Sequence, residues 1–503
     1  MAYIKVSRSA SGAQTVQLAT KYHGKTQILK HFGSAHTESE LIQLKALANK
    51  ALHSPEQQVD LFAQRFELKR VRVIGHAPIY FQELIAYYYR LLGFEDLGPI
   101  LLFDLVLLRL YFPCSKLRSL RLLKTQFGKS YGIDAVYRLL PKLADEQRGS
   151  KDRLLKKLYD AQSRYYTSQL TVILYDVTTL YFEAARDEDE YKLPGYSKDG
   201  KNKDPQILVG LLANTEGFPM GYETFPGNTF EGQTLLVALQ SWQKQFTTSK
   251  LRVVADAGML SKLNTALLNK HDFDFIVGAR LKSVPANLTK QLIAIKKEDM
   301  AIETLVHDGN RLIVQYSAKR AKKDLHTLDK AVVKAQAIVD GKQSLKRRSK
   351  FLVIDEPSKT AKSLNQAAID QDKALAGLKG YITNLTTNEA SDEEVIAQYR
   401  ELWHIEQSFR MSKHDLRARP IFHYKEDSIK AHLQIVIMAL AIARLLEKDS
   451  GQSLQKTVEQ LTQALSYELF DTETNEKLIQ HPEIEKLDIP TELASLLRQA
   501  LTH

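Results

Sequence analysis

A lone carboxylate, Glu406, lies in a stripe of aromatic and cationic side chains on one predicted helix. The stripe follows steps of four, three, four, three and four residues along the chain, which places its members on one helical face. The members are Tyr399, Trp403, Glu406, Arg410, Lys413 and Arg417. One acid among cations and aromatic rings suits a site where the acid holds a metal ion and the cations hold phosphates. The other interpretation is an amphipathic helix with ordinary surface ion pairs.

Two aspartates supply further carboxylates of the same kind. Asp176 follows the apolar run LTVILY, and Asp256 follows LRVVA, so we expect each to end a strand at the rim of a sheet, where ligands are commonly held. Oxygen ligands of this type suit Mg²⁺, and two such ions about 3.5–4 Å apart can drive phosphoryl displacement. An aspartate that follows a strand is, taken alone, more often a turn former or a helix cap. Only folding can unite them with Glu406, so the three are predicted together.

Glu231 is interpreted differently. It follows Asn228 and Thr229, which we expect to cap a helix, and a carboxylate in the first turn complements the helix dipole. The sequence therefore gives no strong reason to count Glu231 as a metal ligand.

The elements that must position these residues change character along the chain. Strand-like runs and helical segments alternate after residue 166 in the order β-β-β-α-β-α-β, which predicts an α/β fold with a mixed sheet flanked by helices. A second apolar stripe, 100° from the first, should anchor the helix that carries Glu406 to the core. Its members are Leu402, Ile405, Phe409 and Leu416.

Five segments follow from these patterns. We expect a β-hairpin and helical DNA-binding region (1–165), a first core part (166–282), a basic insertion (283–376), a second core part (377–450) and a helical tail (451–503). Residues 319–350 of the insertion hold eleven Lys or Arg and three Asp. This patch is either a nucleic-acid contact or a solvated Lys-rich helix.

Composition limits the class of protein. The 503 residues are too many for one core, and a net charge of +11 favours a polyanionic partner such as nucleic acid. A single cysteine, Cys114, excludes an internal disulfide framework and suits a reducing cytoplasm. The longest apolar run, 435–446, is too short for a bilayer span of about 20 residues. We therefore expect a cytoplasmic protein with no membrane partner.

The motifs resemble those of a DDE transposase of a bacterial insertion sequence, in the group with a Tyr-Arg-Glu-Lys signature. Tyr399, Glu406 and Lys413 match that signature at its spacing, but Leu402 occupies the Arg position, where Arg400 or Arg410 would have to substitute. The stretches VILYDVTTLYFE, GYSKDGKNKDPQILVGLL, PGNTFEGQTL and VVADAGML also resemble this group, in its order. The resemblance spans residues 170–447.

This resemblance implies a ribonuclease-H-like core with an insertion domain between the second Asp and the Glu. It implies that Asp176, Asp256 and Glu406 bind Mg²⁺ and catalyse DNA cleavage and strand transfer, with Mn²⁺ able to substitute. It also implies that Tyr399 and Lys413 contact DNA at the transposon ends. Arg410 and Trp403 are expected to join them, although Trp403 equally suits packing against a neighbouring helix.

The expected partners are transposon-end and target DNA, with a homodimer pairing the two ends. The alternatives are a metal nuclease of the same fold without strand transfer and a non-catalytic DNA-binding protein derived from a transposase.

Overall fold

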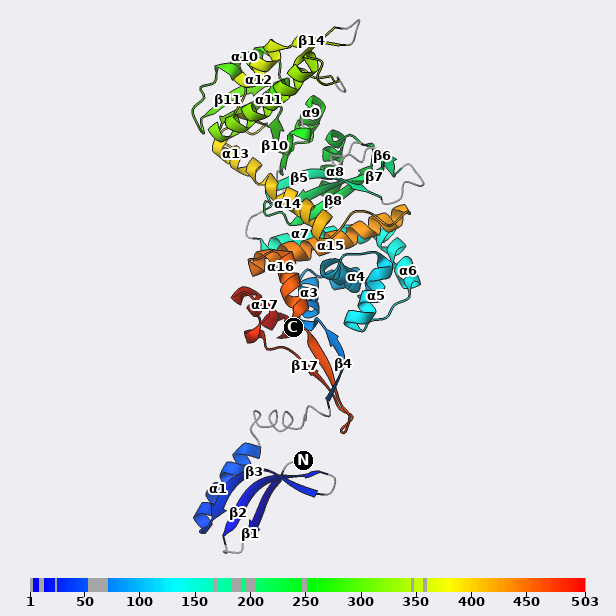
Figure 1. The fold of residues 1–503 in the computed structure, drawn as a ribbon, viewed down its shortest axis with the longest axis vertical. Helices are drawn as coiled ribbons and strands as arrows, with labels where there is room; N and C mark the ends of the chain where they lie inside the picture. The colour runs from blue at the N-terminus through cyan, green and yellow to red at the C-terminus, as the bar shows by residue number, and fades with distance from the viewer. Residues whose placement is uncertain are drawn as a thin grey trace. The chain divides into compact units, whose positions relative to one another are not determined.

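The computed structural model describes residues 3–8, 13–22, 25–52, 71–166, 170–182, 191–195, 204–246, 251–259, 261–344, 348–355 and 360–502. These residues form two compact units (Figure 1). Unit 1 comprises Met1–Ala77 and Leu465–Glu483, and unit 2 comprises Pro78–Ala464 and Ile484–His503. All of the candidate site residues belong to unit 2.

Unit 1 is built from two antiparallel sheets. The first has the order β1-β2-β3 and is packed against α1; the second has the order β17-β16-β4. The bounds are β1 (Tyr3–Arg8), β2 (Gln14–Tyr22), β3 (Lys25–Ala35), α1 (Glu38–Leu52), β4 (Val71–Ala77), β16 (Ser466–Asp471) and β17 (Lys477–Gln480). The prediction of an entirely helical tail is wrong here, because β16 and β17 form a hairpin that pairs with β4 from the other end of the sequence.

A bundle of helices forms one part of unit 2. Several of its members pack against α15 (Glu426–Ser450), whose most apolar 18-residue window is 94% buried. By length and composition this is the one helix among the described residues that could cross a membrane, but it is the centre of the bundle. The other members are α3 (Ile79–Leu91), α4 (Ile100–Tyr111), α5 (Lys116–Phe127), α6 (Ile133–Ala144), α7 (Ser150–Tyr165), α16 (Leu454–Gln463) and α17 (Thr491–Thr502).

The sheet of unit 2 contains the strand order β8-β7-β5-β9-β10. Strands β7 and β8 pair antiparallel in succession on one side of β5, whereas β9 and β10 follow parallel to β5 on the other. The bounds are β5 (Val172–Tyr181), β7 (Pro205–Ala213), β8 (Pro219–Pro226), β9 (Arg252–Ala255) and β10 (Asp274–Ala279), with α8 (Glu231–Gln245) and α9 (Lys262–Lys270) as connections and β6 (Leu193–Pro194) beside β7. This order and these directions are those of a ribonuclease-H-like core, so the predicted fold class is confirmed.

The same sheet continues past β10 through β15, β12 and β11, all antiparallel. Two strands of the predicted insertion thus extend the core sheet, and Leu288 and Leu292 pack in the main core. Residues from 328 to 369 form a small separate cluster that includes Leu328, Phe351 and Ile369. The bounds are α10 (Ala286–Ala294), β11 (Ile302–His307), β12 (Asn310–Tyr316), α11 (Ala318–Val339), β13 (Leu352–Asp355), β14 (Thr360–Leu364), α12 (Gln366–Ala374) and β15 (Leu378–Thr383).

Beyond β15 the chain returns to the core in two consecutive helices. Helix α13 (Asp392–Arg400) starts with a complete capping box between Ser391 and Glu394, and α14 (Leu402–Arg410) continues into a π-helical turn, Met411–Asp415. The apolar stripe is fully buried, as its period predicts: Leu402, Ile405, Phe409 and Leu416. The predicted single helix is therefore two consecutive helices, and the apolar stripe still packs against the core.

Candidate active site

The two aspartates lie side by side on neighbouring parallel strands. Strands β5 and β9 pair in register up to Tyr175 and Ala255, so Asp176 and Asp256 each follow the last paired residue. Adjacent strands are about 4.8 Å apart, which brings the two carboxylates to the same part of the rim. Asp256 ends β9 as predicted. The prediction for Asp176 is wrong, because β5 continues to Tyr181 by pairing with β7 alone.

Short hydrogen bonds orient both carboxylates. The Val177 amide donates to Asp176 Oδ1 at 2.8 Å, and the Ala257 amide donates to Asp256 Oδ1 at 2.7 Å. The Tyr399 hydroxyl also donates to Asp256 Oδ1, at 3.2 Å.

Glu406 lies across a cavity of about 240 Å³ from Asp176. Helix α14 contacts β5, and the exposed Glu406 side chain faces the cavity together with Glu231 from the start of α8. Cations complete the lining: Arg410, Lys413 and Arg419, with His414 beside them. The cavity therefore combines three carboxylates with a cationic wall.

Lys379 and Tyr399 connect the neighbourhood of Asp256 to that of Glu406. The Lys379 ammonium lies 4.6 Å from the centre of the Tyr399 ring. Burial lowers the pKa of Lys379, as do Arg320 and Arg400, whereas the negative charges of Asp256 and Glu406 raise it. Burial raises the pKa of Tyr399, and the same two carboxylates raise it further. Both acids thus act on the same pair of side chains.

Buried polar contacts fix the segment that follows the π-helical turn. Arg109 of α4 donates to the Leu416 and Arg417 carbonyls at 3.3 and 3.4 Å and lies 3.5 Å from His432 Nδ1. Complete burial lowers the pKa of Arg109 to about 10. The helical bundle therefore holds the backbone between Lys413 and Arg419, two members of the cationic wall.

The acid set can be tested for its fit to divalent cations. Among the described residues, no three His, Cys, Asp or Glu side chains are close enough to hold one ion by themselves. Mg²⁺ normally takes only one or two carboxylates and completes its shell with water and substrate phosphate. Asp176 next to Asp256, and Asp176 across the cavity from Glu406, give two such pairs of oxygen ligands. These pairs therefore offer oxygen ligands of the kind that Mg²⁺ prefers.

The structure separates the residues predicted to contact DNA. Arg410 and Lys413 line the cavity beside Glu406. Tyr399 is buried, at 7% exposure, and its ring packs edge-on against Tyr381 at 4.9 Å. Trp403 is 54% exposed, and its ring lies 3.7 Å from the His404 ring, outside the cavity lining. Only two of the four predicted DNA contacts therefore share the cavity with the carboxylates.

Sequence reasoning missed three charged residues of this neighbourhood: Lys379, Arg419 and Glu231 as a cavity residue. Lys379 lies on β15 next to the apolar Leu378, and this change from an apolar to a polar residue along the strand was the only available signal. Arg419 lies in an irregular segment whose backbone position depends on contacts with α4, such as those of Arg109. Local sequence patterns did not place Lys379 or Arg419 at the site, because both residues reach it through tertiary contacts.

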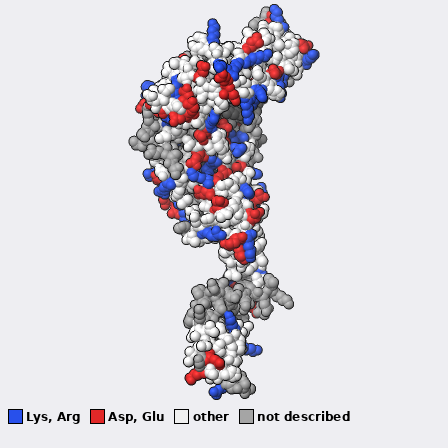
Figure 2. Space-filling view, turned by 90° about the vertical axis from the view of Figure 1, so that its left-hand side faces the viewer, with Lys and Arg blue, Asp and Glu red and all other residues white. Residues whose placement is uncertain are grey.

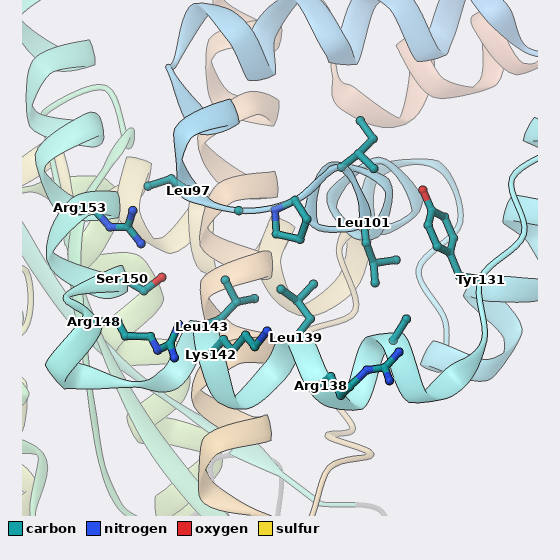
Figure 3. A pocket seen from close by; sticks show the side chains of 14 residues that line it. Leu97, Leu101, Tyr131, Arg138, Leu139, Lys142, Leu143, Arg148, Ser150 and Arg153 are labelled. Atoms are coloured by element: carbon teal, nitrogen blue, oxygen red, sulfur yellow. The ribbon is translucent and has the colours of Figure 1, made fainter.

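A second, larger cavity of about 590 Å³ lies in the helical bundle (Figure 3). Leucines of α4 and α6 form its apolar part, and four cations surround it: Arg138, Lys142, Arg148 and Arg153. Arg148 pairs with Asp145 at 3.0 Å, and Arg153 donates to the Asp96 carbonyl. Arg138 and Lys142 form no ion pair with a described residue. None of the three carboxylates lines this cavity.

Charge of both signs is spread over the surface. On the face drawn in Figure 2, Lys and Arg alternate with Asp and Glu, without a continuous field of one sign. A polyanion would therefore be held by local clusters of cations such as those of the two cavities.

Comparisons with known proteins give a family and a similar solved structure. A family model described as "Transposase DDE domain" matches residues 167–442, more than half of the chain. No curated protein matches. A solved structure described as "Cryo-EM structure of piggyBac transposase synaptic complex with hairpin DNA" is similar at 8% sequence identity, with a TM-score of 0.37 over 85% of this chain and 82% of that one.

Proposed function

We propose, from the fact that this chain belongs to the transposase DDE domain family, that it cleaves DNA at the ends of an insertion sequence and joins the freed 3′-OH to target DNA. The main support is the register of β5 and β9, which sets Asp176 beside Asp256, with Glu406 facing the same cavity as Asp176. The protein would act in the cytoplasm. It would act as a homodimer, because two transposon ends must be paired.

Asp176, Asp256 and Glu406 would hold two Mg²⁺ ions, or Mn²⁺ in their place. When bound, such ions polarise the phosphate and favour deprotonation of the attacking hydroxyl. The carboxylates would fix the positions of the reactants and balance charge as it moves from the attacking to the leaving oxygen. Water is the first nucleophile and the 3′-OH the second, so no covalent bond to the protein is required.

The cationic wall would bind the DNA backbone. Arg410 is the better substitute for the missing signature Arg, since it lines the cavity, whereas Arg400 donates to Gln315 at 3.2 Å and Leu402 is buried. Tyr399 would position Asp256 through its hydrogen bond and would not reach a phosphate. The exposed Trp403 remains a candidate for stacking on a base.

An assay with a pre-cleaved transposon end and a supercoiled target plasmid tests this function. In the presence of Mg²⁺, we expect a product in which the end is covalently joined to the plasmid. Plasmid nicking without joining would instead identify a metal nuclease of the same fold. Binding without either reaction would identify a DNA-binding protein without catalysis.

Replacing Lys413 by Ala should weaken binding to transposon-end DNA, because one cation of the wall is lost. The log–log slope of affinity against salt concentration should flatten by up to about one unit. Fluorescence anisotropy over a salt series measures this slope. Lys244→Ala, on the exposed side of α8, is the control and should keep the wild-type slope. An unchanged slope in the Lys413 variant would show that Lys413 contacts no phosphate.

The double variant Arg138→Ala, Lys142→Ala should also lower affinity for DNA, since the helical bundle is proposed to belong to the DNA-binding region. Loss of both cations should flatten the salt slope by up to about two units and leave the rate of cleavage at saturating DNA unchanged. Lys244→Ala combined with Lys270→Ala provides a control of equal charge. Wild-type affinity and slope in the test variant would assign the cavity of Figure 3 to another ligand.

A further inference from the structure

Glu231 differs from an ordinary first-turn glutamate in where its carboxylate lies. It is the first residue of α8, and its side chain lines the cavity together with Asp176 and Glu406. Its carboxylate makes no hydrogen bond or ion pair with any described residue. The helix it starts is capped by Phe230 without a side-chain hydrogen bond, so the predicted capping by Asn228 or Thr229 is wrong.

A chain of buried hydrogen bonds fixes the backbone of Glu231 to the strand of Asp176. The Tyr175 hydroxyl donates to Thr234 Oγ1 at 2.7 Å, and Thr234 Oγ1 donates to the Glu231 carbonyl at 2.6 Å. Tyr175 precedes Asp176 directly, and its hydroxyl occupies the space left by the missing side chain of Gly210 on β7. The first turn of α8 is therefore joined to β5 beside the candidate metal ligands.

A second glycine, Gly258, lies close to the carboxylate itself. A Cβ atom added to Gly258, two residues after Asp256, would lie 3.5 Å from Glu231 Oε2. Glu231 thus extends from the cavity that contains Asp176 towards the turn Ala257–Met259, which follows Asp256. The Glu231 carboxylate therefore lies between the cavity beside Asp176 and the turn that follows Asp256.

Such an arrangement needs positive charge. Three carboxylates face one small cavity and repel one another. Arg410, Lys413 and Arg419 supply positive charge in the same lining, but Glu231 forms no ion pair with any of them. The helix dipole favours an acid at this position, but it would act equally on a side chain turned to solvent. The dipole therefore explains the residue type at position 231 but not the direction in which the carboxylate extends.

We propose that Glu231 is a fourth carboxylate of the active site and that, paired with Asp176 in the cavity they share, it takes part in binding one of the two divalent cations proposed for this site. This inference rests on the proposed function, from which the metal requirement follows. It enlarges the acid set from two aspartates and one glutamate to two of each. Glu231 helps to bind the cation and affects the bound phosphate only through that cation. It does not act as a nucleophile.

Direct binding of Mn²⁺ to the full-length protein, without DNA, tests the proposal. Electron paramagnetic resonance of the free ion gives the dissociation constant for each variant. Glu231→Gln should raise it about ten-fold, a loss typical of residues that support a metal site. The matched control is Glu393→Gln, because Glu393 is an exposed first-turn glutamate of α13 remote from the cavity. This variant should keep the wild-type constant.

The Asp176→Asn variant distinguishes a failure of the Glu231 proposal from a failure of the proposed metal site. Weaker Mn²⁺ binding in both Asp176→Asn and Glu231→Gln supports the proposal. Weaker binding in Asp176→Asn with wild-type binding in Glu231→Gln overturns the role of Glu231 and leaves the proposed function intact. Wild-type binding in both overturns the metal site itself.

Thermal unfolding in EDTA distinguishes a metal role from a helix-stabilising one. Glu231→Gln should melt at or above the wild-type temperature without metal, because one repelling charge is gone, and should gain less stability than wild type from Mn²⁺. A lower melting temperature with a wild-type gain from Mn²⁺ would overturn the proposal. Glu231→Asp keeps the charge but shortens the side chain, so an intermediate Mn²⁺ affinity is expected even if the Gln variant folds poorly.

Discussion

Replacing Asp176 by Asn is expected to lower the rate of DNA-end cleavage by about a thousand-fold or more, equivalent to the several kcal/mol that metal-ion catalysis supplies. Asp176 belongs to both proposed pairs of ligands, since it is beside Asp256 on the sheet and faces Glu406 across the cavity. No other described acid has both neighbours. Single-turnover cleavage of a labelled transposon end at saturating protein measures the effect on chemistry alone.

Binding of the same DNA should survive this change, because the cationic wall is untouched. Asp256→Asn and Glu406→Gln should also abolish detectable cleavage. Asp329→Asn, on the exposed face of α11, serves as the control and should cleave at the wild-type rate. If Asp176→Asn cut at the wild-type rate, the assignment of the three acids would have to be abandoned.

Replacing Gly210 by Ala is expected to destabilise unit 2 by about 3 kcal/mol, the upper end of typical overpacking penalties. The added methyl group would overlap the Tyr175 hydroxyl, which is buried between β7 and α8. Relief of this overlap requires Tyr175 to give up its hydrogen bond to Thr234. The melting temperature of the metal-free protein, followed by near-ultraviolet circular dichroism, reports the loss.

A double-mutant cycle with Tyr175→Phe identifies the cause. Gly210→Ala should destabilise the protein less in the Tyr175→Phe background, because the hydroxyl that the new methyl group overlaps most is absent. The coupling free energy between the two substitutions should be about 1 kcal/mol or more. Gly132→Ala is the control, since a Cβ there meets no atom within 4 Å; it should cost about 1 kcal/mol or less as a change at a helix N-cap. Full additivity in the cycle would contradict the proposed overlap.

The features that the sequence predicts well depend on local periodicity. The apolar stripe of α14 is buried because residues spaced by three and four share a helical face. The run 435–446 forms the centre of α15 because a continuous apolar segment must be covered on all sides. The mixed sheet follows from the alternation of strand-like and helical runs, and this class of fold is confirmed.

The features that the sequence does not reveal depend on distant partners. The runs around Asp176 do not show that β7 is longer than β9, so the end of β5 is misplaced. The helical stripe places Tyr399 beside Glu406 but cannot show that β15 covers its ring through Tyr381. Glu231 has the spacing of a dipole-stabilising acid, and only the packing of α8 on the sheet reveals the cavity it faces.

The order in which the chain is synthesised has a consequence for when the site can exist. Asp176 and Asp256 leave the ribosome early, but β10 gains its antiparallel neighbour β15 only after about a hundred further residues, and Glu406 follows later still. The contacts of Arg109 with Leu416 and Arg417 are made later again, between residues more than 300 positions apart in unit 2. A polypeptide that ends before Glu406 therefore lacks one of the three proposed acids and also Arg410, Lys413 and Arg419 of the cationic wall, so the proposed site is complete only late in translation.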